Sequence, residues 1–278
     1  MKFLKNIVKK ILIFLKIYNF IRVFRRKKFA YNYYKSQIFL LKKWAWKNNE
    51  DTNFYYQLTD HNLDILAHII SLVTNKTYNE IKSYFDELEN DKFLKHQLQN
   101  ELLKLNYGKD IIFNYGRRIG WYAISRALKP KIIIETGVSH GVGSCVLSKS
   151  LILNKIDGFP GKYFGTEIDL SMGKLLDGKY KENSEILYGD SIKSLEKFKF
   201  KIDLFINDSD HSSDYEYLEY NTIANKLSDN AIILGDNSHS TDKLSVFSKE
   251  KGRKFIFFKE QPLNHWYPGA GIGISFKI

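Results

Sequence analysis

Short β-branched runs alternate with helical stretches through the second half of the chain, and this alternation restricts the fold more than any other feature. The expected strands are 131–136, 162–167, 185–188, 202–207, 231–235, 254–258 and 271–277. The helices expected between them are 142–153, 171–177, 191–197, 214–227 and 239–250. Such an alternation predicts an α/β fold, in which helices cover both faces of a mostly parallel sheet.

The preceding part of the chain lacks this alternation and is expected to be helical. Residues 30–107 contain no glycine, Thr77 and Glu80 form a capping-box pattern, and Pro130 ends a further helix over 117–128. The other expected helices are 33–46, 62–74, 77–88 and 91–105. The aromatic residues expected in the core are Trp44, Trp46, Tyr55 and Tyr56. The expected organisation is a basic amphipathic helix over 1–28, a helical cap over 29–114 and the sheet domain over 115–278.

The net charge of +12 is concentrated at the N-terminus. Residues 1–28 hold ten lysines and arginines and no acidic residue, so +12 less ten leaves +2 for the remainder. Polar residues at helical spacing place one face of this segment in water; they are Lys2, Lys5, Lys9, Lys16 and Asn19. The longest apolar run, Ile11 to Leu15, is too short to span a membrane, which needs about 20 residues. This helix is therefore expected either on an anionic membrane surface or against protein.

The charge and cysteine content also restrict partners and compartment. The near-neutral remainder has no broad basic groove, so a nucleic-acid partner is not expected. The single cysteine, Cys145, excludes a disulfide within the chain and suggests a reducing compartment. We expect a cytoplasmic protein, with peripheral contact at the inner face of the membrane if the basic helix binds lipid.

A glycine-rich turn follows the first expected strand and opens a helix. It runs from Glu135 through Gly137, Ser139 and Gly141. Glycine lets a ligand approach the backbone, and the free amides of a helix N-terminus receive its polar groups. The spacings from Gly137 to Gly141 and on to Gly143 do not match the G-x-G-x-x-G pattern of dinucleotide sites, which disfavours NAD(P).

Polar residues also follow the second and third strands. Glu167, with Asp169 in reserve, is expected to accept both hydroxyls of a ribose. Asp190 or Ser191 is expected to contact an adenine ring, although Asp190 would equally suit a helix N-cap. The carboxyl ends of parallel strands meet at one edge, so these residues and the glycine-rich turn predict a site for a nucleoside cofactor.

Acidic residues end the fourth and fifth strands. Asp208 lies 28 residues before Asp236 and its neighbour Asn237, a separation that suits strand, helix, strand. Three oxygen ligands at one edge would suit Mg²⁺ or Ca²⁺. His211 follows Asp208 and could accept a proton, since the pKa of an imidazole is about 6.5. The alternative is that these are ordinary turn and cap residues and that His211 is solvated.

The order of these motifs over residues 115–278 resembles class I S-adenosylmethionine (SAM)-dependent methyltransferases. The segments Gly116–Tyr122 and Val142–Leu153 resemble a bacterial O-methyltransferase branch. The resemblance implies a seven-stranded Rossmann-like sheet, its last strand antiparallel, with the helical N-terminal part as an extension. It implies SAM as cofactor, and the residues that would hold it are Glu135, Gly137, Ser139, Gly141, Glu167, Asp190 and Ser191.

The acidic strand ends are similar to those of the cation-dependent catechol and caffeoyl-CoA O-methyltransferases. In those enzymes an Asp and an Asp-Asn pair hold the metal, which corresponds here to Asp208, Asp236 and Asn237. The caffeoyl-CoA type carries a lysine where this chain has His211. Macrolide-sugar O-methyltransferases resemble this site and use a histidine base.

The sequence therefore predicts a SAM-dependent O-methyltransferase that acts on a hydroxyl of a small molecule or saccharide. Asp208 and a divalent cation would lower the pKa of that hydroxyl, and His211 would take its proton. The alternatives are an NAD(P)-dependent sugar-modifying enzyme and a catalytically inactive methyltransferase-like scaffold at a membrane surface. The acceptor and the oligomeric state are left open.

Overall fold

A computed structural model describes residues 2–47, 55–104, 112–236 and 238–277. The chain divides into two compact units. The first consists of Met1–Asn48 and Asn264–Tyr267, and the second of Asn49–Leu263 and Pro268–Ile278.

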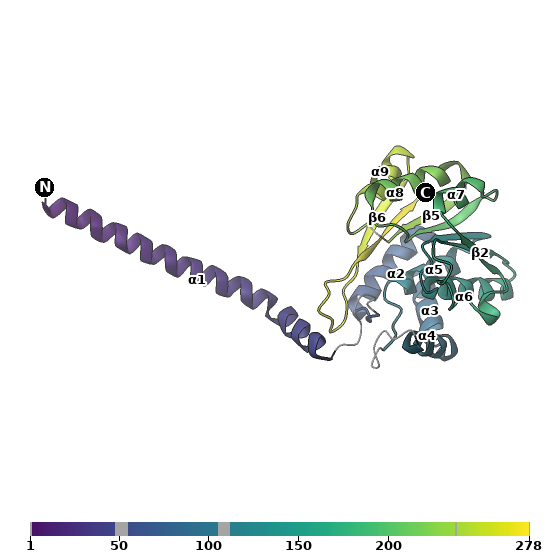
Figure 1. The fold of residues 1–278 in the computed structure, drawn as a ribbon, viewed down its shortest axis with the longest axis horizontal. Helices are drawn as coiled ribbons and strands as arrows, with labels where there is room; N and C mark the ends of the chain where they lie inside the picture. Colours follow the sequence, from purple (N-terminus) through teal and green to yellow (C-terminus); the bar gives the residue numbers. More distant parts are fainter. Residues whose placement is uncertain (1, 48–54, 105–111, 237, 278) are drawn as a thin grey trace. The chain divides into compact units, whose positions relative to one another are not determined.

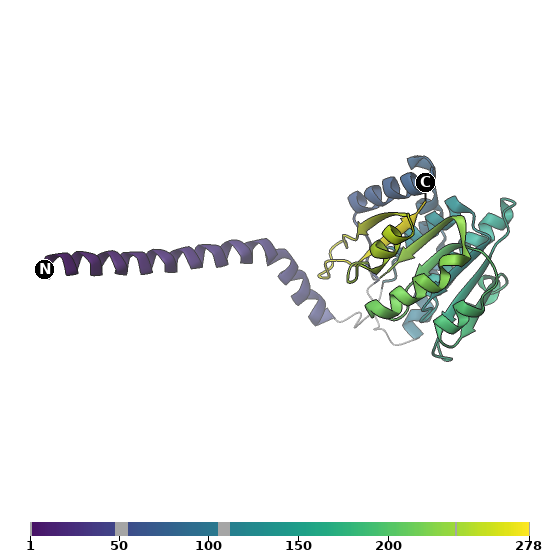
Figure 2. The ribbon, with the colours of Figure 1, turned by 90° about the horizontal axis from the view of Figure 1, so that it is seen from above.

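The first unit is dominated by one long helix, α1 (Lys2–Lys47), shown in purple in Figures 1 and 2. The basic segment and the helix expected over 33–46 are thus continuous, because neither glycine nor proline interrupts them. Trp44 packs against Trp266 with ring centroids 5.1 Å apart. Trp46 is 90 % exposed, so its expected place in the core is wrong: it has no packing partner that removes it from water.

Apolar side chains of α1 remain exposed, among them Phe14, Phe20 and Phe24. The polar face of residues 2–19 does not continue along the helix. Arg22 lies one turn after the exposed Tyr18, on the same side, so basic and apolar residues surround the later turns. Within the described residues, no helix is both long and apolar enough to cross a membrane.

A seven-stranded sheet forms the centre of the second unit, in the order β3-β2-β1-β4-β5-β7-β6. The strands are β1 (Ile132–Thr136), β2 (Lys162–Glu167), β3 (Ser184–Tyr188), β4 (Ile202–Asn207), β5 (Leu227–Gly235), β6 (Lys254–Lys259) and β7 (Gly271–Phe276). Strands β1 to β5 are parallel, and β7 runs antiparallel between β5 and β6. The predicted mostly parallel, Rossmann-like sheet is confirmed. The strand order reverses between β1 and β4, which is where ligands bind in sheets of this kind.

Helices cover both faces of this sheet (Figure 2). The helices of the second unit are α2 (Asp60–Thr74), α3 (Tyr78–Glu89), α4 (Lys92–Lys104), α5 (Arg118–Leu128), α6 (Val142–Ile156), α7 (Ser191–Lys197), α8 (Ser213–Ile223) and α9 (Lys243–Glu250). Helices α2, α3, α5 and α6 pack together, and α7, α8 and α9 pack side by side. The predicted capping box is confirmed, since Thr77 and Glu80 each accept the other's backbone N–H at the start of α3.

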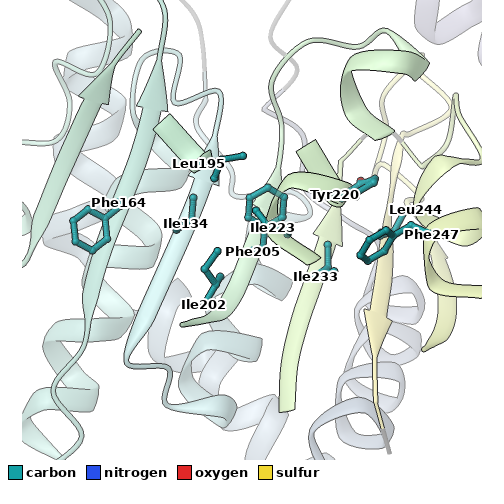
Figure 3. Close-up of a cluster of buried hydrophobic side chains, with 10 residues drawn as sticks. All are labelled: Ile134, Phe164, Leu195, Ile202, Phe205, Tyr220, Ile223, Ile233, Leu244 and Phe247. Atoms are coloured by element: carbon teal, nitrogen blue, oxygen red, sulfur yellow. The ribbon is translucent and has the colours of Figure 1, made fainter. Parts of the chain in front are cut away.

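The core between the sheet and α7 to α9 is apolar and aromatic (Figure 3). Its members are Ile134, Phe164, Leu195, Ile202, Phe205, Tyr220, Ile223, Ile233, Leu244 and Phe247. Alternate residues of a strand point to opposite faces, so Ile134 faces this core while Glu135 faces α6. This alternation fixes which strand-end residues reach the site.

One expected helix is absent from the described structure, namely the one over 171–177. Gly173 there has φ +77°, and its N–H donates to the carbonyl oxygen of Ser139 at 2.7 Å. The N–H of Leu175 donates to the carbonyl of His140 at 3.1 Å. This segment therefore binds the glycine-rich turn instead of forming its own helical hydrogen bonds, and only a short 3-10 helix follows, over Gly178–Tyr180.

Candidate active site

A cavity of about 650 Å³ lies at the carboxyl ends of the parallel strands, on the side where the strand order reverses. Its volume suits a cofactor or drug-sized ligand. The predicted site residues that line it are Glu135, Gly137, Ser139, Glu167, Asp190, Ser191, Asp208, His211 and Asp236. Arg117 and Arg118, at the start of α5, line it too. The convergence predicted from strand ends is thus present in the structure.

The glycine-rich turn is shaped by close contact with the end of β4. Gly137 has φ +81°, and a Cβ atom added there would collide with the backbone carbonyl of Asp208. The amides of Gly137 and Val138 both donate to the carbonyl of Thr166, at 3.0 and 3.2 Å. Glycine is therefore required at this position by the positive φ and by the backbone that follows β4.

Glu167 holds the same turn from the end of β2. Its carboxylate accepts the amide of Ser139 at 2.7 Å and the amide of Asp169 at 2.9 Å. Each carboxylate oxygen has a second lone pair, so Glu167 can also accept ligand hydroxyls. Asp169 is exposed on the rim, and its carboxylate accepts the amide of Ser171, which lowers its pKa. The structure thus makes Glu167 the better placed of the two candidates.

Asp190 is the N-cap of α7, as one of its two predicted roles required. One of its oxygens accepts the amide of Lys193 at 2.9 Å, and the other accepts the hydroxyl of Tyr215 at 2.9 Å. Ser191 contacts the same tyrosine, with the two hydroxyl oxygens 2.9 Å apart. Tyr215 also lines the cavity and was not predicted. No motif marked it, because it is brought there by the packing of α8 beside α7.

A second unpredicted residue, Glu219 of α8, lies fully buried beneath the cavity. It accepts hydrogen bonds from Thr136 at 3.0 Å and Ser209 at 2.8 Å, and also from Ser191 and Asn207. Burial raises its pKa. One carboxyl group thereby ties together the ends of β1 and β4 and the start of α7, which keeps the cavity floor in one arrangement.

Glu135 lies in the wall of the cavity, and its side chain accepts hydrogen bonds from Tyr163 and Ser144. Burial raises the pKa of this carboxyl group from 4.5 to about 7, against the lowering effects of those hydrogen bonds and of Arg118. Near neutral pH it can therefore gain or lose a proton when a charged group binds beside it.

The two described aspartates of the predicted metal site, Asp208 and Asp236, lie side by side. Asp236 is paired with an arginine, Arg117. Asp236 is 3 % exposed, and both of its carboxylate oxygens accept hydrogen bonds from Arg117, through Nε and Nη2. A hydrogen bond also joins Asp208 to Asp236. Burial raises the pKa of Asp208 well above its ordinary value, and the neighbouring Asp236 raises it further. Burial alone would raise the pKa of Asp236 too, but Arg117 holds it below the ordinary value.

This arrangement does not fit a divalent cation. A hard cation needs accessible, negatively charged oxygens, whereas both oxygens of Asp236 already accept hydrogen bonds from the guanidinium of Arg117. Among the described residues, no group of three His, Cys, Asp or Glu side chains is arranged to hold a metal. The third predicted ligand, Asn237, lies outside the described residues.

Two histidines line the cavity. His211 is exposed and lies three residues beyond Asp208. His140 belongs to the glycine-rich turn, and burial lowers its pKa, which favours the neutral imidazole. His211 therefore lies at the cavity, and its role as a base stays a prediction.

Residues 134–238 match a family of methyltransferase domains. This part of the chain is a methyltransferase domain. The match and the sheet topology together support the predicted class I methyltransferase fold. No curated protein matches the chain in sequence.

Solved structures share the fold of this methyltransferase domain. One is assigned as a caffeoyl-CoA O-methyltransferase from Staphylococcus aureus (16 % identity, TM-score 0.51, 73 % of this chain and 100 % of that one). A methyltransferase from Geobacter sulfurreducens is 14 % identical (TM-score 0.51, 72 % and 98 %). A third, assigned as an O-methyltransferase from Klebsiella pneumoniae, is 16 % identical (TM-score 0.50, 68 % and 90 %). At these identities the likeness establishes the shared fold.

We expect Gly137→Ala to abolish binding of S-adenosylhomocysteine (SAH) to the methyltransferase domain and to cost about 1–3 kcal/mol of unfolding free energy. The new methyl group would push the turn away from Asp208. Gly158→Ala is the matched control, because Gly158 has φ +91° but open space around it. Calorimetric titration with SAH and urea unfolding would measure both effects. Equal SAH affinity in the two variants would contradict this account of the turn.

The raised pKa of Glu135 predicts a pH-dependent stability. Between pH 4.5 and about 7 the unfolded carboxyl group is ionised while the folded one keeps its proton. The free energy of unfolding should therefore fall as the pH rises through this window, by about 3 kcal/mol relative to Glu135→Gln, and then level off. Urea unfolding of both proteins across this range would test it, with Glu182→Gln at an exposed site controlling for net charge. Parallel stability curves for the wild type and Glu135→Gln would contradict the burial effect.

Proposed function

We propose that this protein transfers a methyl group from SAM to a hydroxyl oxygen of a small-molecule or saccharide acceptor. The observation that carries the proposal is that one cavity joins the glycine-rich turn and Glu167 to Asp208 and His211. The first two features suit a nucleoside cofactor, and the last two provide polar groups beside which an acceptor can bind. The cavity volume suits small ligands rather than a macromolecule.

The residues present fit SAM along the length of the cavity. In the proposed arrangement Glu167 accepts the ribose hydroxyls, and Asp190 and Ser191 lie beside the adenine. Glu135 and Arg118 complement the two charges of the amino-acid end, the ammonium and the carboxylate. Arg118 supports this placement, because its Nε is buried without a hydrogen-bond partner among the described residues. A buried donor of this kind is costly unless a ligand satisfies it.

SAM supplies an electrophilic methyl group on a sulfonium. The acceptor oxygen forms a bond to this carbon as the carbon–sulfur bond breaks, so the hydroxyl must lose its proton. We assign that proton to the imidazole of His211, which lies on the cavity rim. The cavity walls orient the acceptor oxygen for in-line attack, which contributes much of the rate enhancement.

Labelled SAM with a panel of sugar and phenol acceptors would test the reaction. We expect acceptor-dependent label transfer, and a decrease in kcat of about 10²- to 10⁴-fold in His211→Gln with unchanged SAH affinity. His96→Gln, at an exposed histidine of α4 outside this cavity, is the control. Binding of NADH without SAH would favour a sugar-modifying redox enzyme, and SAH binding without turnover would favour an inactive scaffold.

We further propose that α1 binds an anionic membrane surface. It carries fourteen lysines and arginines and no acidic residue, so the net charge of +12 less fourteen leaves −2 for the rest of the chain. Its exposed phenylalanines, such as Phe14, Phe20 and Phe24, can enter the headgroup region while the basic side chains bind lipid phosphates.

Sedimentation of the full chain with vesicles would test this contact. We expect binding to phosphatidylcholine vesicles that contain phosphatidylglycerol, little binding without it, and loss at high salt. The test variant replaces Arg25, Arg26, Lys27 and Lys28 with glutamine and should bind at least about tenfold more weakly. The charge-matched control replaces Lys193, Lys197, Lys199 and Lys201. If the protein is a dimer and does not bind anionic vesicles, α1 instead forms a contact between subunits.

A further inference from the structure

We infer that Arg117 occupies the position that the sequence predicted for a divalent cation, so that a guanidinium orients the acceptor oxygen and the site works without a metal ion. The inference rests on the proposed methyl transfer. It starts from the disagreement between the predicted metal site and the contacts that Asp208 and Asp236 make.

Arg117 and Asp236 form a bidentate ion pair. Nε and Nη2 donate to the two oxygens of a single buried carboxylate, which is the strongest geometry for an arginine–carboxylate pair. A cation at Asp236 would compete with the guanidinium for the same two carboxylate oxygens. Displacing Arg117 from them would leave its guanidinium partly buried and without its carboxylate partner, which is strongly unfavourable.

A second buried acid, Glu260, also holds Arg117 in place. The backbone N–H of Arg117 donates to Oε1 of Glu260 at 3.0 Å, and Glu260 is fully buried. The other oxygen of Glu260 accepts hydrogen bonds from the hydroxyl of Tyr56 at 2.8 Å and the amide of Ala270 at 3.2 Å. The guanidinium therefore lies between two buried acids whose positions are fixed by β5, β6 and the chain before α2.

Electrostatics oppose a second cation at this place. Arg117 and Arg118 both line the cavity with Asp208 and Asp236. Like charges in a partly buried site repel with little screening, so a divalent ion beside two guanidinium groups would bind weakly. The charge that the acids require is already provided by the protein.

Arg117 retains a donor for the reaction. Its Nη1 lies 3.8 Å from Oε2 of Glu260, which is longer than a hydrogen bond, and the side chain is 16 % exposed at the cavity wall. An N–H group there can donate to the acceptor oxygen and stabilise the negative charge that develops on it. Because arginine stays protonated, this donor is present at every working pH.

The first test needs no acceptor. We expect electron paramagnetic resonance of Mn²⁺, titrated into the SAH-bound wild-type protein, to show no binding site tighter than about 1 mM. One site per chain of higher affinity would overturn the inference. Calorimetry with SAH is run on the same sample: failure of SAH to bind would reject the proposed function, which is a separate outcome from Mn²⁺ binding.

The second test asks whether Arg117 is what excludes the ion. Arg117→Ala frees the carboxylate of Asp236 and should increase Mn²⁺ affinity by at least about tenfold. Arg118→Ala removes a neighbouring positive charge without freeing that carboxylate, so its gain in Mn²⁺ affinity should be clearly smaller. Equal gains in the two variants, or no gain in a folded Arg117→Ala protein, would overturn the inference. If Arg117→Ala does not fold, the wild-type titration decides alone.

With an acceptor in hand, EDTA should change wild-type turnover by less than about twofold, whereas Arg117→Ala should lower kcat by about 10²- to 10³-fold. Added guanidinium ion should restore part of the activity of Arg117→Ala, which it would not do if the arginine served only to hold the fold. Complete loss of wild-type turnover in EDTA would contradict a metal-free site.

Discussion

The close approach of the glycine-rich turn to the end of β4 is the contact on which the cavity depends. Gly137 lies against the backbone of Asp208 with no room for a side chain, and its amide is fixed to the end of β2. Three adjacent strands are thereby joined at their carboxyl ends. The reversal of strand order opens a space beside this junction, and the residues that follow each strand become its walls.

Buried carboxyl groups hold the walls of this cavity in a single arrangement. Each carboxyl group is bound to a different set of partners. Glu219 accepts four side-chain hydrogen bonds beneath the floor, and Glu167 accepts two backbone amides of the turn region. Asp236 is paired with Arg117. A buried acid is costly alone and stabilising when it is satisfied, so these contacts favour one geometry over many.

The pairing of Arg117 with Asp236 changes how the chemistry is understood. Acids at the ends of β4 and β5 suggest a metal when only their order is known. Once a guanidinium is seen to be hydrogen-bonded to Asp236, the same acids position a fixed positive charge. Stabilisation of a developing oxyanion then comes from an organic cation that belongs to the fold.

The sequence by itself determined the elements and the strand ends, because these are written in short-range patterns. β-branched runs bounded by turn residues located all seven strands, and the residues after β1 to β5 located the cavity. The helix expected over 171–177 does not form, because tertiary hydrogen bonds to Ser139 and His140 replace local ones.

Only the tertiary structure decided the partners of the acids: Arg117 and Asp236 are 119 residues apart, and Glu219 and Thr136 are 83 apart. No local pattern encodes contacts of that range, which arise when packing brings distant helices and strands to one edge.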